Sequence, residues 1–252
     1  MKRSWTARTG VTATMGVLSL ALVTGCGGGS DGDSKAAAGA RQSEAPASPA
    51  TTAAKALGSA ELEKLLLVQS DLPRDKVADG DATLPKSRSE LKTDKAACAP
   101  LAYALTGLPP GDTDAGASNT VTSEERTGDA FDVTMTSVGL SSYGGDGAAQ
   151  ALKAVSEGIA ACSGGFGITA QGEELKITKV AAGKASGKGD ESVAFVVDAD
   201  MDGEGTGAFT VEVVRVGSLV STYYSVDFAS IESGRTSAVP LAVIDAQVGK
   251  LA

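Results

Sequence analysis

The stretch from Gly27 to Ala56 contains no Val, Ile, Leu, Met or aromatic residue, so it cannot contribute to a hydrophobic core. A segment of such low hydrophobicity stays disordered, because it buries too little apolar surface to offset its conformational entropy. As a flexible coil it would span about 30 Å. The part of the chain that can fold therefore begins at Leu57 and runs to Ala252, a length suited to one domain.

Residues 1–25 resemble the signal peptide of a bacterial lipoprotein. The apolar run from Val11 to Val23 has the length of a signal-peptide core and is shorter than the roughly 20 apolar residues of a spanning helix. It ends in Leu22-Val23-Thr24-Gly25-Cys26, which resembles the lipobox that precedes a lipidated cysteine. An ordinary secretory signal with an incidental cysteine is the alternative. The positive region at the amino terminus is supplied by Lys2, Arg3 and Arg8.

Lipid attached to Cys26 would determine the cellular location of the protein. One acyl chain holds a protein marginally at a bilayer, whereas two or three hold it firmly. We therefore expect a lipoprotein, with palmitate or a similar acyl group, anchored to the extracytoplasmic face of the cell membrane. Residues 26–56 would be its disordered tether and residues 57–252 its working domain.

The two other cysteines, Cys98 and Cys162, form one candidate pair. In an oxidising compartment we expect a disulfide between them. The long enclosed loop would make this bond worth about 4 kcal/mol in the chain-entropy description. Two free buried thiols are the alternative. Zinc is disfavoured, because a chain with two such cysteines and no histidine cannot complete a usual zinc shell. We predict no metal and no cofactor.

The charge and the missing histidine exclude several classes of function. A net charge of −9 becomes more negative when the three basic residues of the leader are lost, so nucleic acid is not an expected partner. Without histidine there can be no Ser-His-Asp or Cys-His catalytic site. A two-carboxylate cell-wall hydrolase remains open on residue types alone, although the few aromatic residues argue against a sugar-cleaving cleft.

Apolar residues at helical spacing predict four helices. In the third, Asp146 is the expected cap, and Cys162 falls on the buried face at the end, where Cys98 can reach it. Pro100 is suited to the first turn of the second helix. The predicted helices cover approximately residues 59–70, 98–105, 146–162 and 240–251.

Alternating apolar and polar residues predict strands between the helices. The clearest hairpin joins residues 209–216 to 219–226 through Gly217-Ser218, a two-residue turn. Residues 131–136 predict a strand with one wet face. We therefore predict an α+β fold: an antiparallel sheet of about five to six strands flanked by helices, with one disulfide. The remaining predicted strands lie at residues 121–126, 175–180 and 193–197.

Several short motifs follow one another along residues 57–252. They are Asp71-Leu72-Pro73, Cys98 before Pro100-Leu101, Ala160-Ala161-Cys162, Gly189-Asp190-Glu191-Ser192, Val214-Arg215-Val216-Gly217 and the terminal Lys250-Leu251. Their order resembles the PknH-type extracellular sensor-domain family. This resemblance implies a sheet flanked by helices, a cleft that binds an unidentified ligand, and no catalysis. The family also occurs alone on actinobacterial lipoproteins.

The segment from Asp198 to Thr206 is the sharpest motif of possible chemistry. Asp198, Asp200 and Asp202, followed by glycine, match the first half of an EF-hand calcium loop. The twelfth position is Phe209 instead of glutamate, and strand patterns flank the segment. We therefore favour an acidic turn over a calcium site.

Ser89-Glu90-Leu91-Lys92 spells the S-x-x-K motif of penicillin-recognising enzymes. The companion motifs S-D-N and K-T-G do not occur in the sequence. The apolar surroundings that such a nucleophile needs are also missing. We therefore expect no enzyme activity from this motif.

Tyr143, Tyr223 and Tyr224 are candidate ligand contacts, although packing is the favoured role of each. Along the last predicted strand, Tyr224 shares a face with Val220 and Val226, and Tyr223 points the other way. Our sequence hypothesis is a non-catalytic ligand-binding or sensing domain. An envelope interaction scaffold without a small-molecule site is the alternative. The sequence does not assign the ligand-binding residues.

Overall fold

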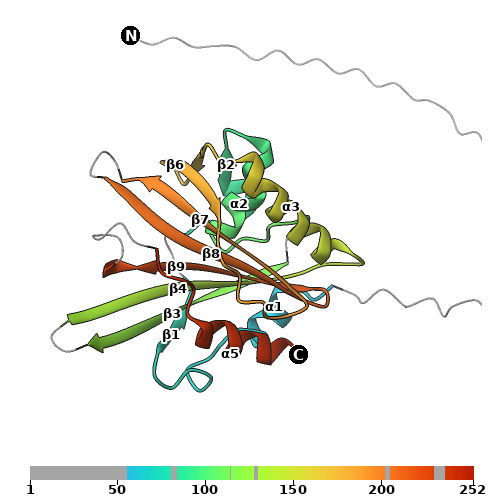
Figure 1. The fold of residues 1–252 in the computed structure, drawn as a ribbon. Coiled ribbons are helices and arrows are strands. Elements are labelled where there is room, and N and C mark those ends of the chain that lie inside the picture. Colours follow the sequence, from blue (N-terminus) through green and yellow to red (C-terminus); the bar gives the residue numbers. More distant parts are fainter. Residues whose placement is uncertain (1–55, 81–83, 114, 128–129, 202–204, 230–235) are drawn as a thin grey trace, which may run out of the picture. The chain divides into compact units, whose positions relative to one another are not determined.

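The computed structural model describes residues 56–80, 84–113, 115–127, 130–201, 205–229 and 236–252. The predicted signal peptide, the lipidation site and nearly all of the predicted tether therefore lie outside the described residues. The described residues belong to one compact unit, residues 50–252. Its helices and strands are shown in Figure 1.

A single sheet forms the centre of this unit, and its described residues make nine strands. The strand order is β1-β3-β4-β9-β8-β7-β6-β5-β2, and every neighbouring pair is antiparallel. The strands are β1 Lys76–Asp79, β2 Leu91–Thr93, β3 Gly116–Thr127, β4 Ala130–Ser142, β5 Phe166–Ala170, β6 Glu173–Ala182, β7 Glu191–Asp200, β8 Thr206–Val216 and β9 Leu219–Asp227.

The predicted fold class, an α+β fold with about five to six strands, is wrong. The sheet has nine strands and dominates the domain, and the helices among the described residues are four short segments. The sequence patterns missed β1, β2 and β5. β1 and β2 are edge strands of four and three residues, too short to show a period. β5 carries Gly167, and glycine weakens the strand pattern.

Leucines at helical spacing predicted a first helix that continues to about residue 70, but the helix is much shorter. The chain turns extended at Leu66, with φ −63° and ψ 155°. Two buried amides hold this extended segment. Asn119 Nδ2 donates to the Leu67 carbonyl at 2.7 Å, and Gln247 Nε2 donates to the Leu65 carbonyl at 2.8 Å. The helices are α1 Ser59–Leu62, α2 Ala99–Leu105, α3 Gly147–Ala161 and α5 Leu241–Leu251.

Helices cover both faces of the sheet. α2 and α3 lie on one face, and α1 and α5 lie on the other (Figure 1). Successive residues of a strand point to opposite faces, so Val213 packs under α2 and α3 while Val214 packs under α5. Because both faces are covered, most residues of the central strands β8 and β9 are buried on both sides instead of having one wet face.

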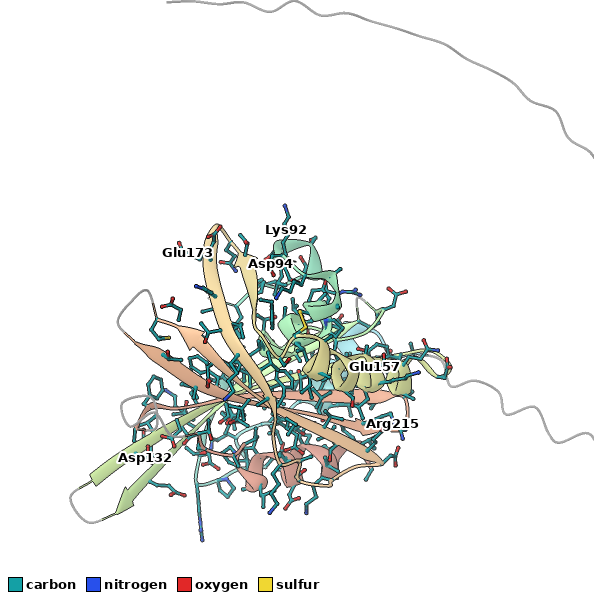
Figure 2. The ribbon with its side chains drawn as sticks, turned by 45° about the horizontal axis from the view of Figure 1, so that its top comes forward. Lys92, Asp94, Asp132, Glu157, Glu173 and Arg215 are labelled. Atoms are coloured by element: carbon teal, nitrogen blue, oxygen red, sulfur yellow. A yellow bond between two sulfur atoms is a disulfide. The ribbon has the colours of Figure 1, made fainter. Side chains whose placement is uncertain are left out.

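The predicted disulfide is present. It joins Cys98, which directly precedes α2, to Cys162, which directly follows α3, with the two Cα atoms 5.9 Å apart. Both cysteines are buried, and the bond lies among the side chains under the two helices (Figure 2). The bond therefore fixes one end of α2 to one end of α3.

Candidate functional site

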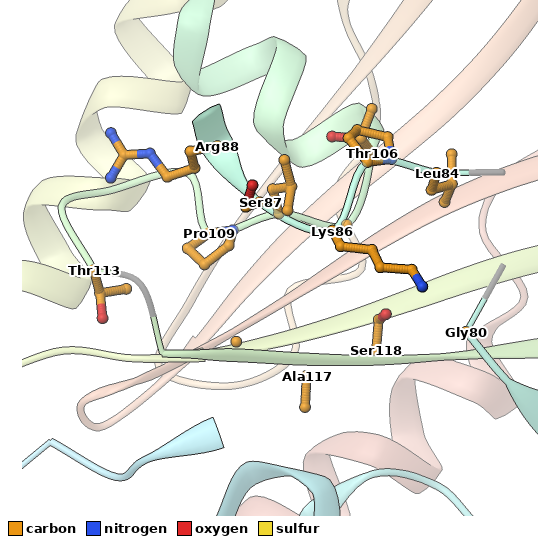
Figure 3. A pocket seen from close by; sticks show the side chains of 14 residues that line it. Gly80, Leu84, Lys86, Ser87, Arg88, Thr106, Pro109, Thr113, Ala117 and Ser118 are labelled. Carbon is orange, nitrogen blue, oxygen red and sulfur yellow. The ribbon is translucent and has the colours of Figure 1, made fainter. Parts of the chain in front are cut away.

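A cavity of about 430 Å³ opens beside the end of α2, on the α2/α3 face of β3. Its lining comes from segments far apart in the sequence (Figure 3). One wall is the loop of residues 84–88. The opposite wall is the turn of residues 106–109 that follows α2, and the base is the start of β3 at residues 116–118. Its volume lies in the range of small-molecule sites.

The first wall is held in place by hydrogen bonds within its own loop. The Glu90 carboxylate accepts from the Lys86 backbone N–H at 3.1 Å and from Ser87 Oγ at 3.1 Å. Both carboxylate oxygens of Glu90 are therefore used to shape the turn that carries Lys86. A wall fixed in this way needs less ordering when a ligand binds.

The second wall is tied to the first through Arg88. Its guanidinium lies 4.7 Å from the ring centre of Tyr103 on α2 and donates to the Gly111 carbonyl at 2.8 Å. The Asp112 carboxylate lies 3.7 Å from the same guanidinium. The Gly111 N–H in turn donates to the buried Tyr143 hydroxyl at 3.1 Å. Arg88 therefore joins the two walls, and its charge is partly balanced.

The sheet next to this cavity carries four hydroxyl groups on one face of three adjacent strands: Ser118 and Thr120 of β3, Ser137 of β4 and Thr222 of β9. We call these four residues the hydroxyl floor. The register aligns Thr120 with Ser137, and Gly139 of β4 with both Ser118 and Thr222. Ser118 lines the cavity directly.

Three hydroxyls of this floor have no hydrogen-bond partner among the described residues. They belong to Thr120, Ser137 and Thr222, whose side chains are 8%, 6% and 2% exposed. A buried hydroxyl without a partner costs free energy, and native structures contain few such groups. Three together, beside a cavity, are the strongest signal of a binding site in the described part of the chain.

The turn after α2 docks directly on this floor. A Cβ atom on Gly139 would overlap the carbonyl oxygen of Gly107 and lie 2.6 Å from Thr222 Oγ1. Gly107 itself has φ +70°, a conformation that favours glycine, and a Cβ there would lie 3.5 Å from Ser137 Oγ. Since Gly107 also lines the cavity, Ser137 and Thr222 lie immediately behind the cavity wall.

The cavity has a positive character in an acidic chain. Lys86 and Arg88 are the only charged residues among those that line it. In Figure 3 the Lys86 side chain extends along β3 above Ser118, whereas Arg88 points away from it. No ion pair of the Lys86 ammonium is found within the described residues.

The three candidate tyrosines are packing residues, as the sequence favoured. Tyr224 shares the α2/α3 face with Val220 and Val226, and its ring centre lies 5.7 Å from that of Phe209. Tyr223 is fully buried on the other face. Burial raises the pKa of Tyr143 and of Tyr223 above the usual value for tyrosine. Tyr143 acts on the cavity only indirectly, through Gly111.

The two sequence motifs of possible chemistry lie away from the cavity base. Ser89 and Lys92 are exposed, and Ser89 Oγ lies 2.9 Å from Ser87 Oγ. Asp198 and Asp200 end β7, but Asp202 lies outside the described residues. No group of three or more metal-ligating side chains is found in the described residues.

The carboxylates do not converge in the cavity. Asp132 and Asp227 lie on neighbouring strands near the tip of the β3–β4 hairpin (Figure 2 labels Asp132). Shielding from solvent, then hydrogen bonding and repulsion from Asp227, raise the pKa of Asp132. The buried Glu212 accepts hydrogen bonds from the backbone N–H and the hydroxyl of Ser186, so it anchors the loop before β7.

Comparisons with known proteins give only distant likenesses, and these are to solved structures. No family model and no curated protein matches the sequence. The crystal structure of the extracellular domain of PknH from Mycobacterium tuberculosis is similar in fold, with a TM-score of 0.42 and 12% identity over 78% of this chain and 95% of that domain. At this level the likeness shows neither family membership nor a shared function.

A search of the helices in the described residues found none that is long and apolar enough to span a membrane.

Proposed function

We propose that this chain is an extracytoplasmic lipoprotein whose domain binds a small ligand without catalysis. The ligand site is the cavity between the 84–88 loop, the 106–109 turn and β3. The observation that carries the proposal is a cavity of small-molecule size with two buried, unpartnered hydroxyls, those of Ser137 and Thr222, immediately behind its wall. Such groups are costly in a structural core, so their position beside a cavity favours a binding role over a packing role for this part of the sheet.

The cavity favours ligand binding over the alternative of a pure interaction scaffold. A scaffold that works through its sheet face needs an open face, but here α2 and α3 cover one face and α1 and α5 the other. The positions of the carboxylates speak against a two-carboxylate hydrolase. No acidic residue lines the cavity, among the residues that the structure describes.

The location of the protein is a separate part of the proposal and rests on Cys26. Labelling cells with a fatty-acid analogue should mark the wild-type chain and leave Cys26→Ala unmarked. Equal labelling of both chains would refute lipid attachment. Extraction of the wild type from the membrane fraction should require detergent, whereas Cys26→Ala should be released without it.

Ligand binding is tested by native mass spectrometry of the full chain purified from its own membrane. We expect a retained small molecule, and we expect Ser118→Phe, which fills the cavity, to lose it. Thr122→Phe changes the same strand at a position outside the cavity lining and should keep the ligand. Retention by Ser118→Phe, in a chain that folds, would contradict the assignment of the cavity.

A further inference from the structure

We infer that the ligand of this cavity is a small organic oxyanion, a carboxylate or phosphate monoester with a compact aliphatic part. This inference rests on the function proposed above and adds the chemical class of the ligand. It follows from three features of the lining: its charge, its hydroxyl donors and its apolar walls.

The charge comes from Lys86. Its ammonium extends into the cavity above Ser118, and the neighbouring carboxylate of Glu90 is already used by the Lys86 backbone N–H and Ser87 Oγ. The chain as a whole is acidic, with a net charge of −9, whereas the charged residues in the described lining of this cavity are both basic. An anion that enters here meets an ammonium with no ion pair in the described residues.

Ser118, the one residue of the hydroxyl floor that lines the cavity, supplies a donor for the oxygens of such an anion. A hydroxyl can donate one hydrogen bond, and donation to an ionised oxygen is about twice as strong as to a neutral one. An oxyanion offers several acceptor lone pairs on one small group, so it can accept from Ser118 Oγ and from the Lys86 ammonium at the same time. A cationic ligand would instead be repelled by Lys86.

The apolar part of the lining limits what the anion can carry. Pro85 and Leu84 lie on one wall, and Leu108 and Pro109 on the other. No aromatic ring lines the described cavity, so the platform on which sugars and nucleobases commonly stack is missing. A short aliphatic chain or branched body can pack between these four side chains, and burying it adds affinity that the bare anion lacks.

The test uses the full-length chain in detergent and matched probes. Pentanoate and butyl phosphate carry the predicted charge on an aliphatic body, pentanamide has the body without the charge, and inorganic phosphate has the charge without the body. Calorimetric titration should give saturable binding of pentanoate or butyl phosphate. Pentanamide should bind about tenfold more weakly, since one charge-assisted contact is worth about that factor. Inorganic phosphate should also bind about tenfold more weakly, because it buries no aliphatic body between the apolar walls.

Substitutions inside and outside the lining test whether the probes bind in this cavity. Lys86→Gln should weaken pentanoate or butyl phosphate about tenfold and leave pentanamide unchanged. Lys92→Gln removes an equally charged, exposed lysine of β2 outside the lining and should change nothing. Ser118→Ala removes the hydroxyl of the floor that lines the cavity and should weaken both anions severalfold. The tighter of the two anions identifies the head group.

The outcomes separate this inference from the proposed function. Equal affinity for pentanamide and pentanoate, or equal loss of affinity in Lys86→Gln and Lys92→Gln, would overturn the oxyanion. If the membrane-purified chain retains a neutral or cationic molecule that Ser118→Phe loses, the binding function stands and the oxyanion class falls. If the chain retains nothing and binds no probe, both fall.

Discussion

Two neighbouring parts of the α2/α3 face of the sheet differ in the kind of side chain that they carry. On β7 and β8, under α2 and α3, the inward residues form a packed core; they are Phe195, Val197, Val211 and Val213. On β3, β4 and the middle of β9 the same face carries the hydroxyl floor, although Val220, Tyr224 and Val226 of β9 still belong to the packed core. Val213 and Thr222 are direct cross-strand partners, so the change occurs between adjacent strands.

The difference between the two regions separates stability from function. The packed core gains free energy by removing apolar surface from water, and its side chains explain why the domain folds. Thr120, Ser137 and Thr222 of the hydroxyl floor are also buried but leave their hydroxyls unpaired, so they cost stability instead of adding to it. The predictions below test this contrast, from the largest expected effect to the smallest.

Truncation of the packed core should be far more harmful than truncation of the floor. Phe195→Ala removes a fully buried ring and should lower the free energy of unfolding by about 3–5 kcal/mol. Ser137→Ala should change it by less than about 1 kcal/mol, because its hydroxyl makes no hydrogen bond. Urea unfolding followed by circular dichroism measures both. Equal losses would erase the distinction between the two regions.

The disulfide supports the packed core by holding the ends of α2 and α3. The double variant Cys98→Ala, Cys162→Ala should lose about 4 kcal/mol, because the unfolded chain regains the entropy of a long closed loop. Thermal melting with and without reductant checks this. A reductant effect that persists in the double variant would show that the bond is not its source.

Val213 and Thr222 are cross-strand partners, one in the packed core and one in the hydroxyl floor. Substituting each with the residue type of the other is the most direct test of the contrast. Val213→Thr places a hydroxyl in the packed core and should lose about 1–3 kcal/mol. Thr222→Val removes an unpaired hydroxyl at nearly constant volume and should be neutral or gain about 1 kcal/mol. A loss in Thr222→Val comparable to that in Val213→Thr would mean that the Thr222 hydroxyl is satisfied in the folded protein.

The smallest expected change in melting temperature concerns Asp132, a carboxylate near the tip of the β3–β4 hairpin (Figure 2). The raised pKa of Asp132 means that the folded state favours its protonated form, so its contribution to stability is present below about pH 3.8 and is lost as the pH rises through the raised value. Asp132→Asn should therefore raise the melting temperature at pH 7 and leave it unchanged at pH 3.

Asp71 provides the matched control with the opposite sign. The hydrogen bond from Lys250 Nζ at 2.6 Å, then that from the Val68 N–H, lower the pKa of Asp71. Its contribution is present above about pH 3.8 and is lost as the pH falls, so Asp71→Asn should lower the melting temperature at pH 7. If both variants shift the melting temperature in the same direction at pH 7, the pKa assignments fail.

Local patterns predicted the elements whose signals are local. The hairpin through Gly217-Ser218 and the helix that ends at Cys162 follow from nearby residues. The pairing of Cys98 with Cys162 was predictable although it is distant in sequence, because these were the only two cysteines left to pair. The strand count was wrong because β1 and β2 are defined by their partners, β3 and β5, instead of by a period of their own.

The sequence patterns did not predict the cavity, for a related reason. Its walls come from the 84–88 loop and the 106–109 turn, whose approach to β3 depends on the whole sheet. A wet strand face was the expectation for Asp132, Thr134 and Thr136, yet Thr136 is buried under the α5 side. A threonine in a strand has the same sequence signal whether it meets solvent, a helix or a cavity, so no pattern could separate these cases.

The contact between Gly107 and Gly139 offers a way to find this arrangement in other chains. A methyl group at Gly139 would push the turn off the strand, and a side chain at Gly107 would strain its left-handed backbone, so the pair acts as a steric signature that survives when overall similarity has disappeared. A distant sequence that keeps both glycines, with small hydroxylated neighbours on the adjoining strands, would be expected to preserve the same hollow. A sequence with a bulky side chain at either position would have to build its binding region elsewhere.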